Sequence, residues 1–108
     1  KSISCIIKQI TKAFDKSINF KNIIIAYEPI WAIGTNVTPK MQEIDYIHYK
    51  IKEAMKRNFN IIKIPVLYGG SVKVANSANI FSLKNVDGGL IGGASLIASE
   101  FCKIYDTL

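Results

Sequence analysis

The chain has 108 residues, 49% of them hydrophobic and 20% charged, which supplies one packed core and excludes a disordered protein. The formal net charge of +6 comes almost wholly from lysines spread along the chain, with Arg57 the single arginine. A nucleic-acid-binding surface would gather basic residues on one element and interleave aromatic ones, so we expect no nucleic-acid partner.

Residues 3–14 are predicted to form an amphipathic helix, because their apolar side chains recur at intervals of three and four. These side chains are Ile3, Ile6, Ile7, Ile10 and Phe14. Lysines interrupt the stretch, and no apolar run in the chain approaches the roughly 18 residues of a membrane helix. The start also lacks the cleavage site of a secretory signal. We therefore expect a soluble protein without a membrane partner, in the cytoplasm or in an organelle such as a plastid.

Residues 22–28, with the sequence NIIIAYE, are predicted to form a buried strand. Continuous apolar and β-branched side chains are typical of a parallel strand that is covered on both faces. A helix is expected next, with Thr38 as its cap and Pro39 at its first position, ending near Arg57 and Asn58. Its apolar residues again repeat at three and four: Ile44, Ile47, Ile51 and Met55.

Residues 64–71 (IPVLYGGS) and 86–95 (VDGGLIGGAS) contain two further predicted strands, each closed by a glycine pair. A short helix is expected between them, over residues 72–81, and another helix ends the chain. The order of one helix and then three strand–helix units indicates right-handed parallel crossovers. The predicted class is α/β, with about three parallel strands and four helices in a single domain over residues 1–108.

The glycine pairs fall where parallel α/β sheets hold ligands, in the loops after the carboxyl ends of strands. Gly69 and Gly70 precede Ser71, and Gly92 and Gly93 follow the third strand, each pair at an expected helix start. Glycine lets the backbone approach a ligand, and free amides at a helix start carry partial positive charge. One pair alone would indicate only a tight turn, but two pairs after successive strands predict a phosphate cradle.

Glu28 ends the first strand at the same edge of the predicted sheet. A carboxylate that is poorly solvated once the site closes holds its proton more strongly, which suits a general base. The alternative is a structural carboxylate paired with a lysine. After Glu28, residues 29–31 form a stiff segment and residues 32–36 a small, flexible one, as expected of a lid on a rigid hinge. This arrangement favours the catalytic interpretation.

Other chemically active side chains are weaker candidates. His48 lies in a helix away from the strand ends, so we expect a surface or helix-packing histidine. Tyr68 could fill core space or direct its hydroxyl toward the lid, and we favour the lid. Cys5 and Cys102 fit neither a metal-site spacing nor a disulfide scaffold and are expected to be buried thiols. No metal and no cofactor is expected.

Three motifs, AYEPIWAIGT, YGGSV and VDGGLIGGASL, occur in this order along the chain. Together they resemble the second half of triosephosphate isomerase, and the resemblance covers essentially all 108 residues. It implies the carboxyl-terminal part of an eight-stranded (β/α)8 TIM barrel. The implied enzyme interconverts dihydroxyacetone phosphate and glyceraldehyde 3-phosphate through an enediol without a cofactor, and is usually a homodimer.

The resemblance also implies roles for individual residues. Glu28 would carry the proton between the two substrate carbons. Backbone amides of Gly34, Ser71, Gly92 and Gly93 would hold the phosphate. The lid and its hinge would include Pro29, Trp31, Ala32, Ile33, Thr35, Thr38 and Tyr68.

Two features depart from the family pattern. Pro39 stands where the family lid usually has alanine, and it has no amide hydrogen to donate to Tyr68, so we expect altered lid closing. A whole barrel also needs about 250 residues, and the family's lysine on the first strand and histidine on the fourth are absent here. We therefore expect a fragment whose barrel lacks its amino-terminal half and which is inactive, or nearly so, by itself.

Two alternatives stay open. One is another phosphate-binding barrel that acts on a different sugar phosphate, although the tryptophan beside the Glu28 segment argues against it. The other is a non-catalytic, truncated phosphate-binding or interaction module that has lost the first half of the site. An upstream segment with an asparagine-x-lysine strand and a histidine-serine-glutamate turn would distinguish the isomerase from such a module.

Overall fold

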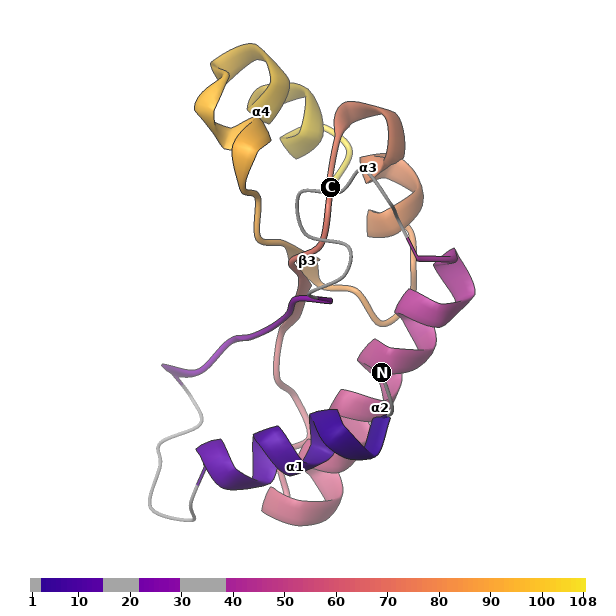
Figure 1. Ribbon diagram of the computed structural model, residues 1–108, viewed down its shortest axis with the longest axis vertical. Helices are drawn as coiled ribbons and strands as arrows, with labels where there is room; N and C mark the ends of the chain where they lie inside the picture. The colour runs from indigo at the N-terminus through magenta and orange to yellow at the C-terminus, as the bar shows by residue number, and fades with distance from the viewer. Residues whose placement is uncertain (1–2, 15–21, 30–38) are drawn as a thin grey trace.

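The computed structural model describes residues 3–14, 22–29 and 39–108 of the chain. Within these ranges, four α-helices and a short 3-10 helix accompany one three-stranded parallel sheet of order β1-β2-β3 (Figure 1). The predicted α/β class, with three parallel strands and four helices, is confirmed. The elements are α1 (Ile3–Ala13), β1 (Ile25–Tyr27), α2 (Met41–Phe59), β2 (Val66–Tyr68), α3 (Val74–Phe81), β3 (Gly88–Gly89), η3 (Gly93–Leu96) and α4 (Ala98–Tyr105).

The register of the sheet aligns the ends of its strands. Tyr27 of β1 lies opposite Tyr68 of β2, and Tyr68 lies opposite Gly89 of β3. The ladder continues one residue beyond the strands, where Gly69 N donates to Tyr27 O at 2.8 Å and Leu90 N donates to Tyr68 O at 2.9 Å. Because the three strands run in the same direction, the turns that follow them begin side by side at one edge.

The first strand is shorter and less covered than the sequence predicts. β1 has three residues; Ala26 is exposed between half-buried neighbours, and Ile24 just before the strand is 62% exposed. Ile25 and Tyr27 pack into the core beside the helices. Within the described residues, the expected cover on both faces is therefore wrong for this strand, since only the helix-facing side chains meet apolar partners.

α2 begins later than predicted. Its N-cap is Lys40, whose carbonyl accepts hydrogen bonds from Glu43 N and Ile44 N, so Pro39 precedes the helix and does not occupy its first position. The predicted cap, Thr38, lies outside the described residues. The helix ends at Phe59, and Asn60 closes it in the left-handed conformation that asparagine tolerates well.

The core has two parts, which α2 joins because it contributes to both. One part surrounds Tyr68, and its buried members are Ile44, Tyr68, Val72, Ile80, Val86 and Ile104. The other surrounds Val66, and its buried members are Ile10, Ile51, Met55, Ile64 and Val66. Figure 1 shows the corresponding layout, with α1 crossing α2 at one end of the molecule and α3 and α4 together at the other. None of the described helices is both long and apolar enough to cross a membrane.

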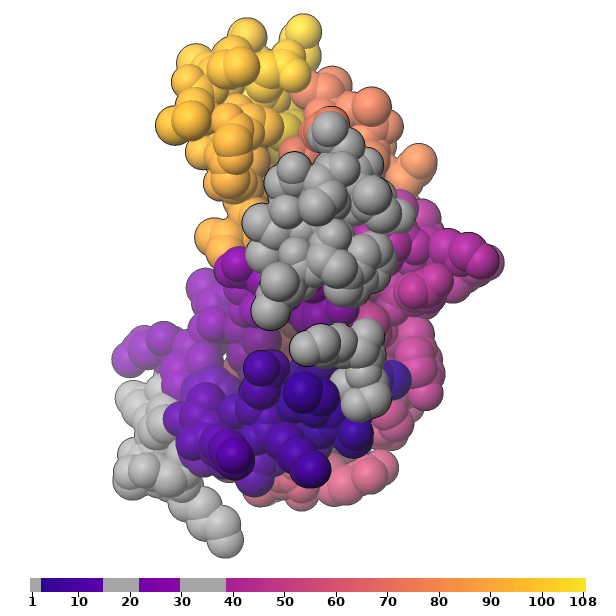
Figure 2. All heavy atoms as spheres, viewed as in Figure 1, coloured from indigo at the N-terminus to yellow at the C-terminus, as the bar shows by residue number. Residues whose placement is uncertain are grey.

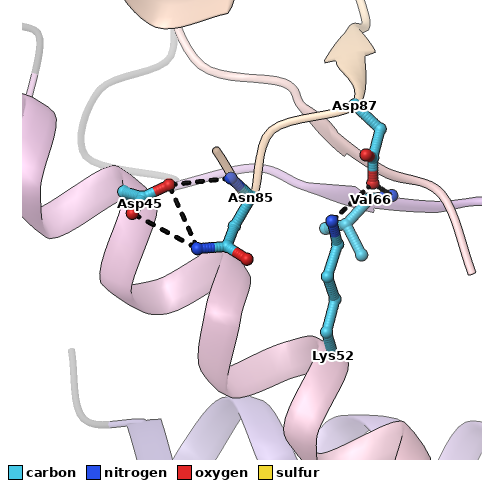
Figure 3. A network of polar contacts seen from close by, with 5 residues as sticks. All are labelled: Asp45, Lys52, Val66, Asn85 and Asp87. Atoms are coloured by element: carbon cyan, nitrogen blue, oxygen red, sulfur yellow. Dashed lines mark hydrogen bonds and ion pairs between the residues drawn. The ribbon is translucent and has the colours of Figure 1, made fainter. Parts of the chain in front are cut away.

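Two acidic side chains tie the turn before β3 to its neighbours (Figure 3). Asp45 of α2 accepts a hydrogen bond from Asn85 N at 2.9 Å and two from the Asn85 side-chain amide, at 3.3 and 3.2 Å. Asp87 accepts one from Val66 N at 2.9 Å and forms an ion pair with Lys52, also at 2.9 Å. These contacts hold β3 against β2 at the edge opposite the glycine turns.

Candidate functional site

Glu28 and Gly69 lie together at the carboxyl edge of the sheet, directly after β1 and β2. The Glu28 side chain extends across the neighbouring strand end, where a Cβ atom at Gly69 would lie 2.5 Å from Glu28 Cγ and 3.3 Å from Tyr27 O. Real Cβ atoms do not approach carbon this closely, so only glycine leaves room for the glutamate here. The carboxylate predicted to act as a base is thus directed toward the turn predicted to bind phosphate.

Glu28 is exposed among the described residues. The poor solvation expected of a general base would require closure of the predicted lid, residues 32–36, which lie outside the described residues. The catalytic role therefore stays a prediction. Pro29, the first hinge residue, is buried and lines a groove beside Glu28.

The turn after β2 is longer than predicted. α3 begins at Val74 with Lys73 as its cap, so Ser71 and Val72 belong to the turn and not to a helix start. Lys73 N donates to Asn76 Oδ1 at 2.7 Å, and Asn76 Nδ2 donates to Ser71 O at 3.1 Å. This asparagine fixes the backbone on both sides of the turn, which holds Ser71 at the carboxyl edge.

Gly92 and Gly93 lie at the start of η3, two residues beyond the last ladder bond of β3. Both are exposed, and a Cβ atom at either would meet nothing within 4 Å. Ser95 donates to Gly92 O through its amide at 2.9 Å and through its hydroxyl at 2.6 Å. The turn is thereby ordered by its own hydrogen bonds, while both glycines face open space. Glu28, Gly69, Gly70, Ser71, Gly92 and Gly93 are called the strand-end site below.

Tyr68 lies beneath this edge with its ring fully buried. Its hydroxyl reaches Gly70, where a Cβ atom would overlap the hydroxyl and the ring, and it has no hydrogen-bond partner among the described residues. Burial, and secondarily the neighbouring Tyr27, raises the pKa of Tyr68 to about 12. The hydroxyl is therefore protonated at neutral pH. The ring fills core space, and a contact with the lid stays a prediction because residues 30–38 lie outside the described ones.

His48 is fully buried on α2, and its ring contacts the rings of both Tyr27 and Tyr68. The helix-packing interpretation is confirmed, and the surface alternative is wrong. Burial lowers the pKa of His48 to about 4, so the ring is neutral at pH 7. The helical spacing from Ile44 to Ile51 could have indicated this, because His48 falls on the same buried stripe.

Several predicted residues lie outside the described ranges, so their roles stay predictions: Trp31, Ala32, Ile33, Gly34, Thr35 and Thr38. The expectation of buried thiols is wrong, because Cys5 and Cys102 are both exposed on helix faces without a partner in the described part of the chain. No group of three or more potential metal-ligating side chains occurs among those residues. The contacts of Asp45 and Asp87 were not anticipated, since nothing in the sequence indicates which acidic side chain meets a turn some 20 or 40 positions away.

An apolar groove of about 600 Å³ runs between α1 and β1 and reaches Glu28. Its wall includes Cys5, Ile6, Ile10, Phe14 and Ile24. Figure 2 shows α1 in indigo and the β1 segment in purple next to each other on this face. Further large apolar side chains are exposed beyond β3: Leu90, Leu96, Ile97, Phe101, Tyr105 and Leu108. Both outer strands of the sheet are therefore flanked by apolar surface.

The comparisons with known proteins agree on one family. Residues 1–108 match the family model described as triosephosphate isomerase. The triosephosphate isomerase of Bradyrhizobium diazoefficiens is 48% identical over 85 residues, which cover 77% of this chain and 34% of that protein. That of Ruegeria pomeroyi is 37% identical over 110 residues, which cover 99% of this chain and 44% of that protein.

The same similarity is found among solved structures. The crystal structure of triosephosphate isomerase from Bartonella henselae superposes with a TM-score of 0.86 at 36% identity, covering 99% of this chain and 43% of that one. The chain thus spans less than half the length of each of these proteins. Its three strands and four helices correspond to part of their barrel.

Proposed function

The chain belongs to the triosephosphate isomerase family, and from this premise we propose that residues 1–108 are the carboxyl-terminal part of a single TIM-barrel domain with isomerase activity. The complete enzyme interconverts dihydroxyacetone phosphate and glyceraldehyde 3-phosphate. The observation that supports this most directly is the position of Glu28 across Gly69, at the edge where the turns of Ser71 and Gly92 also begin.

In the proposed reaction, Glu28 removes a proton from one substrate carbon and returns it to the neighbouring carbon. The electron pair of the broken C–H bond forms the C=C bond of the enediol, while the π pair of the carbonyl moves to its oxygen, which takes up a proton. When the proton returns to the neighbouring carbon, the other hydroxyl loses its proton and becomes the new carbonyl, so no oxidant or reductant is consumed. Backbone amides of Gly34, Ser71, Gly92 and Gly93 hold the phosphate group, because amides bind an anion without carrying a charge that titrates. The proposal includes no cofactor.

Closure of the lid over the substrate would exclude water and discourage loss of phosphate from the enediol. We propose that Tyr68 contacts the closed lid and that Pro39 alters this closure, since proline cannot donate an amide hydrogen to the Tyr68 hydroxyl. Replacing Pro39 by alanine without any change in turnover or in the amount of phosphate released would contradict this part of the proposal.

The remainder of the barrel would cover the apolar surfaces at both outer strands. The apolar surface of the groove between α1 and β1, and that of the exposed side chains beyond β3, each extend over more area than single exposed apolar residues would give. An amino-terminal half that supplies the missing strands would bury both and complete the site. The finished enzyme is proposed to be a cytoplasmic homodimer, as is usual in this family.

The test is the activity of the full-length protein with glyceraldehyde 3-phosphate in an assay coupled to dihydroxyacetone phosphate reduction. Glu28→Gln keeps the size of the side chain and removes the base, so kcat is expected to fall about 100- to 10,000-fold. Glu100→Gln on α4 serves as the control and should leave kcat unchanged. An inactive wild-type protein, or a Glu28→Gln variant with wild-type kcat, would overturn the proposal.

A further inference from the structure

Three aromatic rings contact one another directly beneath the strand-end site. Tyr27 is the last residue of β1 and Tyr68 the last of β2, and the two are partners in the sheet register. The His48 ring lies edge-on to Tyr27, with 5.8 Å between centroids and an interplanar angle of 86°, and 6.1 Å from Tyr68 at 40°. The two tyrosine centroids are 6.4 Å apart. All three distances lie in the range of favourable aromatic contacts.

His48 contributes an aromatic ring to this cluster. It is fully buried, and neither ring nitrogen has a hydrogen-bond partner among the described residues. Backbone groups of Asn85 and Val66 lie close enough to the ring to raise the pKa of His48, which opposes the lowering by burial. An unpaired buried polar group costs stability, so an apolar side chain would serve general packing at least as well. A buried histidine here calls for an explanation beyond filling the core.

The cluster connects α2 to the residues of the strand-end site. Tyr27 precedes Glu28 in the chain, and its carbonyl accepts the hydrogen bond from Gly69 N. The Tyr68 hydroxyl abuts Gly70. The two tyrosine rings are thus next to the backbone that carries Glu28 on one strand and the glycine turn on the other.

We propose that His48 is a positioning residue of the strand-end site: its ring holds Tyr27 and Tyr68 in one arrangement, and thereby Glu28 and the Gly69–Gly70 turn. The effect on turnover rests on the isomerase activity proposed above, whereas the effect on the turn itself does not. His48 does not touch the substrate. Loss of its ring lets the tyrosines relax toward the vacated space and moves Glu28 relative to the turn.

The experiment compares His48→Ala with Met55→Ala in the full-length protein. Met55 is the matched control, because it is also fully buried on α2 but packs in the Val66 part of the core, away from Tyr68. Both variants should lower the midpoint of urea unfolding. Only His48→Ala should lower kcat, by about tenfold or more with little change in KM, since small misplacements of reacting groups are costly.

Two further variants distinguish the effect of an aromatic ring at position 48 from the effect of filling the same volume. His48→Phe restores an aromatic ring against both tyrosines and should return kcat to within about threefold of wild type, on the same positioning argument. His48→Leu fills the space without a flat ring, so it should fold and still lower kcat several-fold. If His48→Leu has wild-type kcat, or Met55→Ala lowers kcat as much as His48→Ala, the inference is wrong.

A readout that needs no activity distinguishes this inference from the proposed function. The amide NMR resonances of Gly69 and Gly70 should shift in His48→Ala and His48→Leu but not in Met55→Ala. If the wild-type protein has no isomerase activity but the Gly69 and Gly70 amide resonances still shift in the His48 variants, the positioning role is retained and the isomerase function is rejected. An active wild type with unshifted Gly69 and Gly70 amides in both His48 variants would reject the positioning role alone.

Discussion

Gly69 and Glu28 occupy one small space at the carboxyl edge of the sheet, and at the scale of single residues this contact matters most. The glutamate crosses the neighbouring strand end only because Gly69 has no side chain. The sequence indicated a glycine turn for phosphate binding, but the structure shows a second task for the first glycine of that turn. It leaves free the space that the glutamate side chain occupies.

We expect Gly69→Ala in the full-length protein to lower kcat by about 10- to 100-fold, because the new methyl group displaces Glu28. The measurement is steady-state kinetics alongside urea unfolding. Gly88→Ala is the control, since a Cβ atom there approaches only the flexible end of Leu67, at 3.1 Å. Equal losses of kcat in the two variants would contradict the assigned contact.

His48 predicts a pH dependence of stability. Its pKa is lowered from 6.5 to about 4 in the folded protein, so folding favours the neutral ring. The contribution of this pKa shift to the free energy of unfolding is fully present above pH 6.5 and is lost as the pH falls from 6.5 toward 4. The whole loss amounts to about 3 kcal/mol. Urea unfolding at pH 7, 5 and 4 should therefore show a smaller loss of stability in His48→Leu than in wild type. Parallel losses would show that His48 does not titrate in this way.

At the scale of elements, α2 organises the molecule. It joins both parts of the core, supplies His48 to the aromatic cluster and binds the turn before β3 through Asp45 and Lys52. The two polar contacts differ in kind. Asp45 satisfies a backbone amide of Asn85, whereas the Lys52–Asp87 pair is partly open to solvent.

We expect the two contacts to differ in their contribution to stability. Asp45→Ala removes the acceptor of a part-buried amide and should cost about 1 to 3 kcal/mol. Lys52→Ala breaks a half-exposed ion pair and should cost less than about 1 kcal/mol. Urea unfolding of both variants measures the two losses of stability. A larger loss in Lys52→Ala than in Asp45→Ala would mean that the Lys52–Asp87 ion pair contributes more than the Asp45–Asn85 hydrogen bonds.

At the scale of the whole molecule, the described residues form a sheet with two outer strands, β1 and β3, and apolar surface beside each. In its relatives, segments of similar length form less than half of a larger chain. Unpaired strand edges and apolar patches of this kind promote association in water.

The purified 108-residue chain is therefore expected to show no measurable isomerase turnover, to bind a hydrophobic dye strongly and to associate. Full-length protein at the same concentration is the control and should show activity, weak dye binding and a defined oligomeric state. Isomerase turnover by the isolated segment would refute this expectation.

The alternation of helices with β-branched runs was sufficient to predict the α/β class and the order of the elements, because the periods of helices and strands are local properties of a sequence. Three motifs in order likewise indicate the family. The boundaries of the elements were less predictable. Helices α2 and α3 both begin two residues or more after the expected start, because their N-caps, Lys40 and Lys73, are set by backbone contacts. The roles of residues in the lid remain predictions.

Only the tertiary structure decided which side chains meet across the sheet. That Glu28 lies over Gly69, that His48 packs against two tyrosines, and that Asp45 reaches Asn85 depend on contacts between segments distant in sequence. Exposure of Cys5 and Cys102 has the same origin, because burial depends on whether a helix face has a partner and not on the residue type. Local patterns determine the element that a residue joins, whereas the packing of whole elements determines its neighbours.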